Sequence, residues 1–238
     1  MVSAGEVSPN WNLFRKKMGW SLNKGNGVSK SKLIAKNDVE DGKKNITKYL
    51  AIDCEMVGAG LYGYDSVLAR VSIVNYREEC IYDTFVKPTL EITDYRTKFS
   101  GVTKKDLKKC PQFQEVQKAV YEMTKGHILV GHGIENDLKA LKLQHPKNKI
   151  RDTSSFRPFL RIRGAKPSLK RLVNYFLGIN IQGGEHDSIE DAKYTMKIFK
   201  LYEKEWEKSL RCRDKRKEIL DKVSLSISEL RNKRSRKA

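Results

Sequence analysis

Hydrophobic and polar positions follow strand-like spacing in the first half of this chain. Short apolar runs at 49–53, 67–76 and 80–86 are typical of strands. The polar residues Arg77-Glu78-Glu79 separate the last two runs, so a hairpin is predicted there, and Lys87-Pro88 ends it.

From residue 113 onward the apolar spacing becomes helical and alternates with further short strands. Apolar residues recur every three or four positions from Phe113 to Thr124, and Lys125-Gly126 follows as the expected helix end. The other predicted elements are a strand at 128–130, a helix from 134, a strand at 150–152, and helices at 168–177 and 188–206. An initial β-meander followed by strand–helix alternation predicts an α/β fold, a mixed β-sheet flanked by helices on both faces.

The C-terminal segment has its own helical stripe. Leu220, Val223, Ile227 and Leu230 follow 3-4-3 spacing. A partner coiled coil would need three or more heptads, so we expect this helix to dock back on the domain.

The composition and charge indicate one domain core with basic extensions. The 238 residues are 39% hydrophobic and 32% charged, with a net charge of +19. Residues 1–48 carry ten basic and four acidic residues, and residues 208–238 carry twelve and four, so most of the excess lies at the two ends. We therefore expect a flexible basic arm at 1–48, a domain at 49–207 and a basic helical tail at 208–238. Such extensions favour a polyanionic partner, and nucleic acid is expected before an anionic membrane.

Several classes of protein are not expected. No apolar run reaches the length of about 18 residues that a membrane span needs, and no secretory signal stands at the start. The four cysteines are far apart and form no Cys-x-x-Cys pair, which argues against a disulfide framework or a zinc module.

Two carboxylates mark the expected end of the first strand. Residues two apart in a strand point the same way, so Asp53 and Glu55 project together. Two like charges at about 6–7 Å are unfavourable without a positive charge between them, and a hard divalent cation is one candidate. An ordinary surface strand is the alternative, and by itself the pair is weak support for a metal site.

Asp137 lies in the first turn of the helix that follows Gly131-His132-Gly133. A carboxylate there favours the helix dipole, and on spacing alone this reading is the stronger one. The alternative is a ligand aimed at a site beside the strand ends.

A third acidic cluster opens the long helix at 188. Asp187 and Glu190 have the spacing of a capping box, which explains both. His186 then lies just outside the helix, and Asp191 lies in its first turn. These two are left to face a cleft.

Asp53, Glu55, Asp137, His186 and Asp191 occur in the order and spacing of the DEDDh exonucleases. The likeness extends to segments that resemble the eukaryotic RNA exonuclease 4 group, which is related to the interferon-stimulated exonuclease. The matching segments, within residues 49–203, are 49–58, 100–103, 131–141, 151–153, 167–172 and 186–192. Gly133 and Glu135 depart from that pattern, which often has Ala and His there.

This resemblance implies a ribonuclease H-like fold and 3′→5′ exonuclease action with two divalent ions, Mg²⁺ or Mn²⁺. By similarity Asp53 would bridge both ions, Glu55 and Asp191 would complete one, and Asp137 would hold the other. His186 would take the proton of the attacking water, because an imidazole can exchange a proton near neutral pH.

The resemblance also suggests where substrate binds. Met56, Val57, Val102 and Thr103 match positions that line the site of the terminal nucleotide. A cluster of cations could form a phosphate path, or simply a solvated face: Arg157, Arg161, Arg163, Lys166, Lys170 and Arg171.

Three functions remain open from the sequence. The first is a monomeric exoribonuclease that acts on single-stranded 3′ ends of RNA, DNA being possible, and that processes ribosomal RNA precursors in the nucleus or nucleolus. The basic run 233–237 could serve as a nuclear address. The second is an RNA-binding ribosome assembly factor with little catalytic use, and the third is a DNA-directed exonuclease.

Overall fold

The computed structural model describes residues 46–160, 166–212 and 215–235, the last six of them by backbone alone. The predicted arm therefore lies outside the described residues apart from its last three positions, as do Trp11, Phe14 and Trp20. Arg161, Arg163 and the side chain of Leu230 also lie outside.

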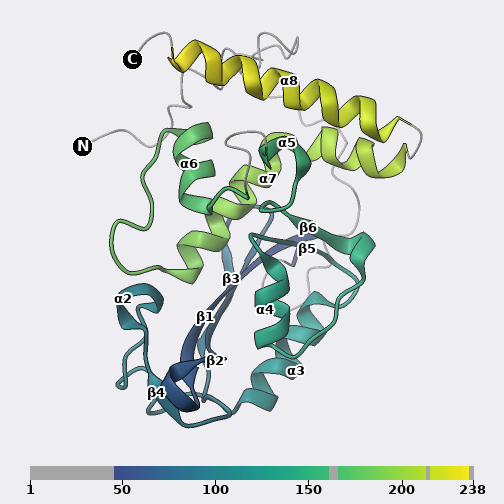
Figure 1. The fold of residues 1–238 in the computed structure, drawn as a ribbon. Coiled ribbons are helices and arrows are strands. Elements are labelled where there is room, and N and C mark those ends of the chain that lie inside the picture. Colours follow the sequence, from purple (N-terminus) through teal and green to yellow (C-terminus); the bar gives the residue numbers. More distant parts are fainter. Residues whose placement is uncertain (1–45, 161–165, 213–214, 236–238) are drawn as a thin grey trace, which may run out of the picture.

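A six-stranded mixed sheet is the centre of the fold (Figure 1). Its main path runs β3-β2-β1-β5-β6, and β4 pairs with β1 beside that path. β1 and β5 are parallel, as are β5 and β6, whereas β2 and β3 form the predicted antiparallel hairpin. The strands are β1 (Tyr49–Ala59), β2 (Asp65–Asn75), β3 (Cys80–Phe85), β4 (Ile92–Asp94), β5 (Ile128–Gly131) and β6 (Ile150–Asp152).

Helices cover both faces, so the mixed sheet flanked by helices is confirmed. They are α2 (Thr97–Ser100), α3 (Phe113–Thr124), α4 (Ile134–Ala140), α5 (Arg157–Leu160), α6 (Leu169–Leu177), α7 (Ser188–Arg211) and α8 (Arg216–Ser235), with 3₁₀ turns η1 (Leu61–Gly63) and η2 (Lys147–Lys149). No helix among the described residues is long and apolar enough to cross a membrane. All four cysteines are free thiols.

The alternating side chains of β1 face two different cores. Leu50, Ile52 and Cys54 pack in a cluster with residues of α3 and β2. Tyr49 and Ala51 pack on the other side, in a cluster with residues of α5, α6, α7 and α8. The face of the sheet toward α7 is therefore the face that Asp53 and Glu55 share.

β1 does not end at the acidic pair, so the predicted strand end is wrong. Antiparallel pairing with β2 continues to Ala59, beyond an irregularity in register between Glu55 and Met56. At this irregularity Glu55 faces Arg70 and Met56 faces Leu68, so Ala69 is an extra residue of β2. Such a bulge bends the strand beside the two carboxylates.

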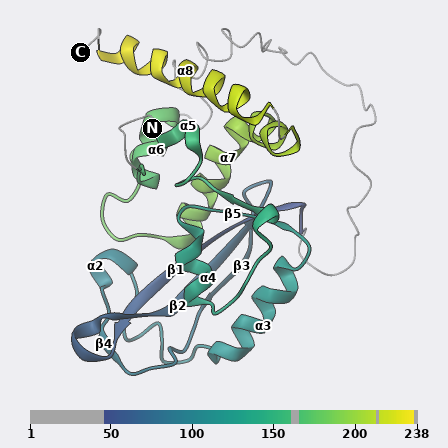
Figure 2. The ribbon, with the colours of Figure 1, turned by 45° about the vertical axis from the view of Figure 1, so that its right-hand side comes forward.

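The C-terminal helix docks on the domain, as its apolar stripe predicts. Leu220, Val223 and Ile227 are buried in the same cluster as residues of α5, α6 and α7. The Tyr175 hydroxyl donates to the carbonyl oxygen of Ile227 over 3.0 Å. Figures 1 and 2 show α8 at the end of the molecule opposite β4.

Candidate active site

An interruption in the sheet opens one edge of β1. Beside β2, β1 pairs continuously from Leu50 to Ala59. On its other edge it pairs with β5 only as far as Ala51, and with β4 only from Gly58. Asp53 and Glu55 lie between these partners, where no strand of the described ranges pairs with that edge of β1.

Asp137 lies against this open edge. Its Oδ1 accepts a hydrogen bond from the backbone N–H of Cys54, with 3.0 Å between the atoms. A Cβ on Gly131 would lie 2.6 Å from Cβ of Ile134, so only glycine lets α4 turn back this tightly after β5. The buried Asp137 thus joins two elements beside the acidic pair, and the helix dipole alone does not account for its position.

Asp191 enters the same place from α7. It is buried in the first turn of that helix, 3.6 Å from the imidazole (Oδ2 to Nδ1 of His186). Oδ2 also accepts a 2.7 Å hydrogen bond from Nε2 of Gln182. The His186 loop is itself fixed, because its backbone N–H donates to the carbonyl of Phe99 over 2.9 Å.

Asp187 has the structural role expected of it. It is the N-cap of α7, and its Oδ1 accepts from the backbone N–H of Ile189 over 3.0 Å. The same oxygen lies 3.2 Å from Nη1 of Arg70. Its carboxylate is therefore engaged in capping and pairing.

Burial raises the pKa values of all four carboxyl groups, and repulsion within the cluster adds to this for Asp53 and Glu55. Burial, followed by repulsion from Asp137 and Asp191, raises the pKa of Asp53 well above its ordinary value. Burial and Asp191 raise the pKa of Glu55 to about 8, although Arg70 opposes the shift. Burial raises the pKa of Asp137 to about 7 against the hydrogen bond from Cys54, and burial also raises that of Asp191.

The donor chemistry of this cluster fits hard divalent cations. Oε1 of Glu55 and Oδ1 of Asp191 are buried and have no hydrogen-bond partner among the described residues. Carboxylate oxygens are the ligands that Mg²⁺ and Mn²⁺ favour, and a cation would relieve both the repulsion and the missing partners. Within the described part of the chain, no three His, Cys, Asp or Glu side chains already form a complete ion site. Binding an ion would therefore draw these side chains together.

A cleft of about 1010 Å³ adjoins the cluster. Glu55, Met56 and His186 line it, which is where Met56 is expected. The structure does not support the predicted contacts of the Val57 and Val102 side chains with substrate. Both side chains are fully buried in one apolar cluster. Thr103 is half-buried, and its hydroxyl donates to Asp106 over 2.6 Å.

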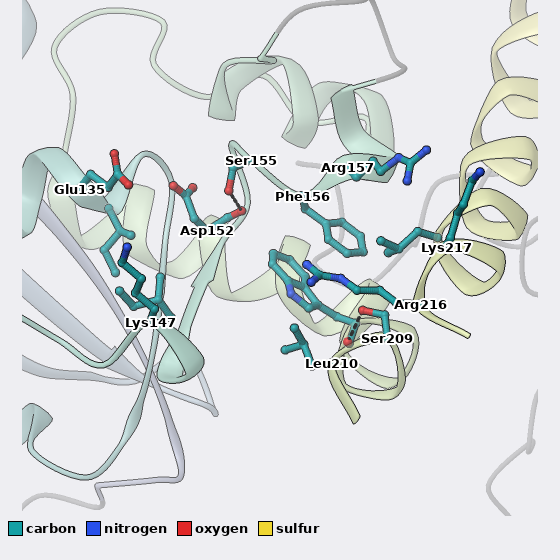
Figure 3. Close-up of a pocket in the computed structure, with 14 residues that line it drawn as sticks. Glu135, Lys147, Asp152, Ser155, Phe156, Arg157, Ser209, Leu210, Arg216 and Lys217 are labelled. Carbon is teal, nitrogen blue, oxygen red and sulfur yellow. Dashed lines mark hydrogen bonds between the residues drawn. The ribbon is translucent and has the colours of Figure 1, made fainter. Parts of the chain in front are cut away.

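The described members of the predicted phosphate path lie in two separate places. Arg157 lines a separate pocket of about 720 Å³ and pairs with Asp221 of α8 over 3.3 Å. In this pocket Arg157 lies on the side of Arg216 and Lys217, with Glu135 on the other side (Figure 3). Glu135, which departs from the family pattern, therefore faces this pocket and does not line the cleft.

The other described cations of that set, Lys166, Lys170 and Arg171, lie on or just before α6. Lys166 and Arg171 are exposed. Lys170 donates from Nζ to the carbonyl oxygen of Gln182 over 2.8 Å, and so supports the residue that bonds Asp191. A phosphate contact by Lys170 stays a prediction.

Two groups of residues at the site were not predicted from the sequence. Gln182 lies in a loop without periodicity and has a positive φ of 53°, so no pattern marks it. Tyr64, Arg96, Phe99, Lys139 and Lys142 line the cleft. They come from a turn, two short segments and the end of α4, which only the tertiary fold brings together.

Comparisons with known proteins place this geometry in a known group. The Exonuclease (RNase_T) family matches residues 50–199. RNA exonuclease 4 of Mus musculus is 53% identical over 165 residues, covering 69% of this chain and 38% of the relative. RNA exonuclease 4 of Debaryomyces hansenii is 50% identical over 183 residues, covering 76% of this chain and 66% of the relative. The chain thus spans about two fifths to two thirds of the length of these relatives.

Solved structures give the fold. The Saccharomyces cerevisiae Pan2 pseudoubiquitin hydrolase–RNA exonuclease module in complex with AAGGAA RNA is similar, with a TM-score of 0.62 and 30% identity. The match covers 80% of this chain and 33% of that one. The Neurospora crassa Pan2 catalytic unit matches with a TM-score of 0.59 and 26% identity, over 74% of this chain and 29% of that one. The exonuclease domains of Pan2 have a ribonuclease H-like fold, so the expected fold is confirmed.

Proposed function

Because the chain belongs to the Exonuclease family, we propose that it is a metal-dependent 3′→5′ exoribonuclease. It would release nucleoside 5′-monophosphates one at a time from the 3′ end of RNA. One observation carries the proposal. Four carboxylates from three separate elements meet beside His186 at the end of an open cleft.

Asp53, Glu55, Asp137 and Asp191 are the residues that would hold two divalent ions, Mg²⁺ or Mn²⁺. When bound, such ions stabilise the charge on the attacking and leaving oxygens of a phosphodiester displacement. The chain itself holds two of these carboxylates in place through hydrogen bonds, from Cys54 to Asp137 and from Gln182 to Asp191.

His186 would act as the general base. Its Nδ1 lies 3.6 Å from Oδ2 of Asp191, which leaves Nε2 to accept a proton from the attacking water. The Asp191 carboxylate would then stabilise the imidazolium. The water oxygen bonds to the phosphorus, and the bond to the 3′ oxygen of the preceding nucleotide breaks. That oxygen takes a proton from solvent to become the new 3′ hydroxyl, and the imidazolium of His186 returns its proton to solvent.

Met56 would bind the terminal nucleotide through apolar contact. It lies in the cleft next to Glu55, and it is half-buried, so part of its side chain is open to a ligand. Action at a free 3′ end would follow if a terminal nucleotide held there, beside the carboxylates, blocks a continuing chain.

RNA is the proposed substrate in preference to DNA, and a monomer is the proposed active form. The choice of RNA is supported by the relatives named RNA exonuclease 4 and by the Pan2 structure in complex with AAGGAA RNA. Matched end-labelled RNA and DNA, single- and double-stranded, would be digested with Mg²⁺, Mn²⁺ or EDTA. We expect single-stranded RNA to be shortened with either metal and to survive in EDTA. Preferential digestion of DNA, or no digestion of any substrate, would contradict the proposal.

Ribosomal RNA precursors in the nucleus or nucleolus are the proposed physiological setting. Support comes from the resemblance to the RNA exonuclease 4 group and from the basic run at 233–237. A fluorescent fusion of the full chain should accumulate in the nucleus, and replacing the lysines and arginines of 233–237 by glutamine should weaken this. Cytoplasmic retention of the unaltered fusion would contradict it.

A further inference from the structure

Large hydrophobic side chains gather at the mouth of the cleft. Of the nine that are exposed among the described residues, five lie between positions 61 and 99. Three of these line the cleft: Tyr64, Leu90 and Phe99, which are 82%, 51% and 64% exposed. A concentration of this kind beside a functional site indicates a binding surface, whereas single exposed apolar residues need no explanation.

The turn that carries Tyr64 is held rigidly. Nη2 of Arg96 donates to the carbonyl of Gly63 over 2.7 Å, and Nη1 donates to the Ser66 hydroxyl over 2.8 Å. The Thr93 hydroxyl donates to the carbonyl of Gly60 over 2.8 Å. The exposed ring is thus placed on a fixed support, and little conformational freedom is lost when a ligand contacts it.

Phe99 is fixed with respect to the proposed general base. Its carbonyl oxygen accepts the backbone N–H of His186 over 2.9 Å. Gly101 allows this close approach, since a Cβ there would lie 3.1 Å from the carbonyl oxygen of His186. The backbone that carries the exposed ring of Phe99 is therefore held next to the His186 loop.

Lysines supply the other wall of the same cleft. Lys139 of α4 and Lys142, just after it, both line it and are both exposed. Figures 1 and 2 show α2 and α4 on either side of β1. The cleft thus combines exposed rings from one side of β1 with ammonium groups from the other.

We infer that this cleft is a stacking subsite for unpaired bases that precede the 3′-terminal nucleotide. Tyr64 and Phe99 stack on these bases, and Lys139 and Lys142 contact the backbone phosphates. Every base has a π-face, so stacking tolerates any sequence but requires bases that are not paired. The inference rests on the proposed function and specifies its substrate as a single strand or an unpaired 3′ overhang.

Binding would be measured with the full chain carrying Asp53→Asn, in Mg²⁺, so that the RNA is not consumed. Replacing a stacking ring by leucine should weaken binding of a single-stranded RNA by roughly 5- to 100-fold, for Tyr64→Leu and Phe99→Leu alike. Tyr64→Phe keeps the ring and should bind like the parent. Tyr121→Leu removes an exposed ring of α3, outside the cleft, and is the matched control.

A second series would locate the contact. Abasic nucleotides would be placed one at a time behind the 3′ end. If Tyr64 stacks on a base, removing that base should weaken binding by Tyr64→Leu much less than it weakens binding by the parent. The two losses of binding free energy should therefore not add. Global unfolding by heat, followed for each variant, would show whether a loss of binding reflects a loss of structure.

The contribution of the two lysines is tested by the salt dependence of RNA binding. For single strands, log affinity falls with log salt by about 0.7 per phosphate neutralised. Replacing Lys139 and Lys142 by glutamine should therefore reduce the slope by about 1.4, and the ring variants should leave it unchanged. Replacing Lys118 and Lys125, which lie on and just after α3 and do not line the cleft, is the charge-matched control.

Two outcomes would overturn the inference. One is that Tyr64→Leu and Phe99→Leu bind no worse than Tyr121→Leu, and the other is that ring and base losses add at every position. Digestion by the chain without Asp53→Asn keeps the two proposals apart. If RNA is still shortened from its 3′ end, only the stacking subsite fails, whereas absence of digestion would contradict the proposed function itself.

Discussion

The side-chain amide of Gln182 donates a hydrogen bond to the carboxylate of Asp191, with 2.7 Å between Nε2 and Oδ2. The other carboxylate oxygen of Asp191 is buried, and no residue that the structure describes forms a hydrogen bond with it. Gln182 therefore orients Asp191 and leaves Oδ1 available for a cation. This contact joins the loop before α7 to the acidic cluster.

Gln182→Leu should weaken Mg²⁺ binding and Mg²⁺-dependent activity by about 10- to 100-fold, because groups that orient a metal-binding carboxylate commonly have effects of this size. Calorimetry with Mg²⁺ and the Mg²⁺ dependence of the rate would measure it. Asn180→Leu alters an exposed residue of the same loop and serves as the control. Equal metal affinity in Gln182→Leu and the parent would show that the amide does not position Asp191.

Asp53→Asn should abolish turnover while the fold remains intact or gains stability. The substitution removes one of four carboxylates that repel one another, and with it a proposed ligand. Single-turnover rates in Mg²⁺ and the melting temperature in EDTA would be compared with the parent. Appreciable Mg²⁺-dependent activity in the pure variant is the outcome that the metal-binding role cannot accommodate.

His186→Ala should lower the rate by about 10²- to 10⁴-fold, the usual contribution of a general base. Metal affinity by calorimetry should stay near that of the parent, since the proposed ligands are the carboxylates. If metal binding were lost as well, His186 would be a ligand and its assignment as the base would be wrong.

The metal-free protein should lose stability as the pH rises from about 4.5 to about 8. Folding raises the pKa of Glu55 from 4.5 to about 8 and that of Asp137 from 3.8 to about 7. The folded state therefore binds more protons than the unfolded chain over this range, and the free energy of unfolding falls with pH. Denaturation in EDTA at several pH values would measure the slope, and Glu55→Gln should reduce it. A free energy of unfolding that rises over this range would contradict the shifts.

α8 should contribute to stability, so removing residues 208–238 should be costly. Burial of Leu220, Val223 and Ile227 stabilises the fold by roughly 1.5–3 kcal/mol each, a large share of a typical total of about 5–15 kcal/mol. Deletion should therefore lower the melting temperature strongly or prevent folding. A deletion variant that melts like the full chain would show that the helix is dispensable.

Charge on the tail is better tested in the intact chain. Replacing the exposed Arg216 and Lys217 by glutamine should reduce the salt slope of RNA binding by about 1.4, if the tail attracts RNA. Because α8 lies at the end of the molecule opposite β4, the effect should require a long RNA and vanish with a short one (Figure 2). An unchanged slope with long RNA would mean that these charged side chains are solvated at the surface and do not bind RNA.

Local patterns were sufficient to predict most elements of the fold. The helical spacing at 113–124, the helix expected at 168–177 and the capping residue Asp187 predicted elements that the structure contains. β1 was predicted too short, because its extension depends on pairing with β2, a contact that residues 54–59 do not reveal. The long helix was predicted to end near Trp206, yet α7 continues to Arg211.

Site residues could be predicted only where their side-chain chemistry and their order along the chain form a recognisable pattern. The carboxylates and His186 stand in a recognisable order, and the structure brings them together. Gln182, Tyr64 and Phe99 have no such signal, because their positions depend on turns and on tertiary hydrogen bonds. The side chains of Val57 and Val102 show the reverse error, since apolar residues near a site are as easily part of the core.

Direction of degradation tests the central claim most directly. A 5′-labelled single-stranded RNA would be incubated with the full chain in Mg²⁺, beside the same RNA blocked at its 3′ end and a circular RNA. We expect progressive shortening of the free RNA to a ladder of 5′-labelled products, with both other RNAs intact and with no shortening by Asp53→Asn. Rapid cleavage of the circular RNA, or equal degradation of the 3′-blocked RNA, would contradict it.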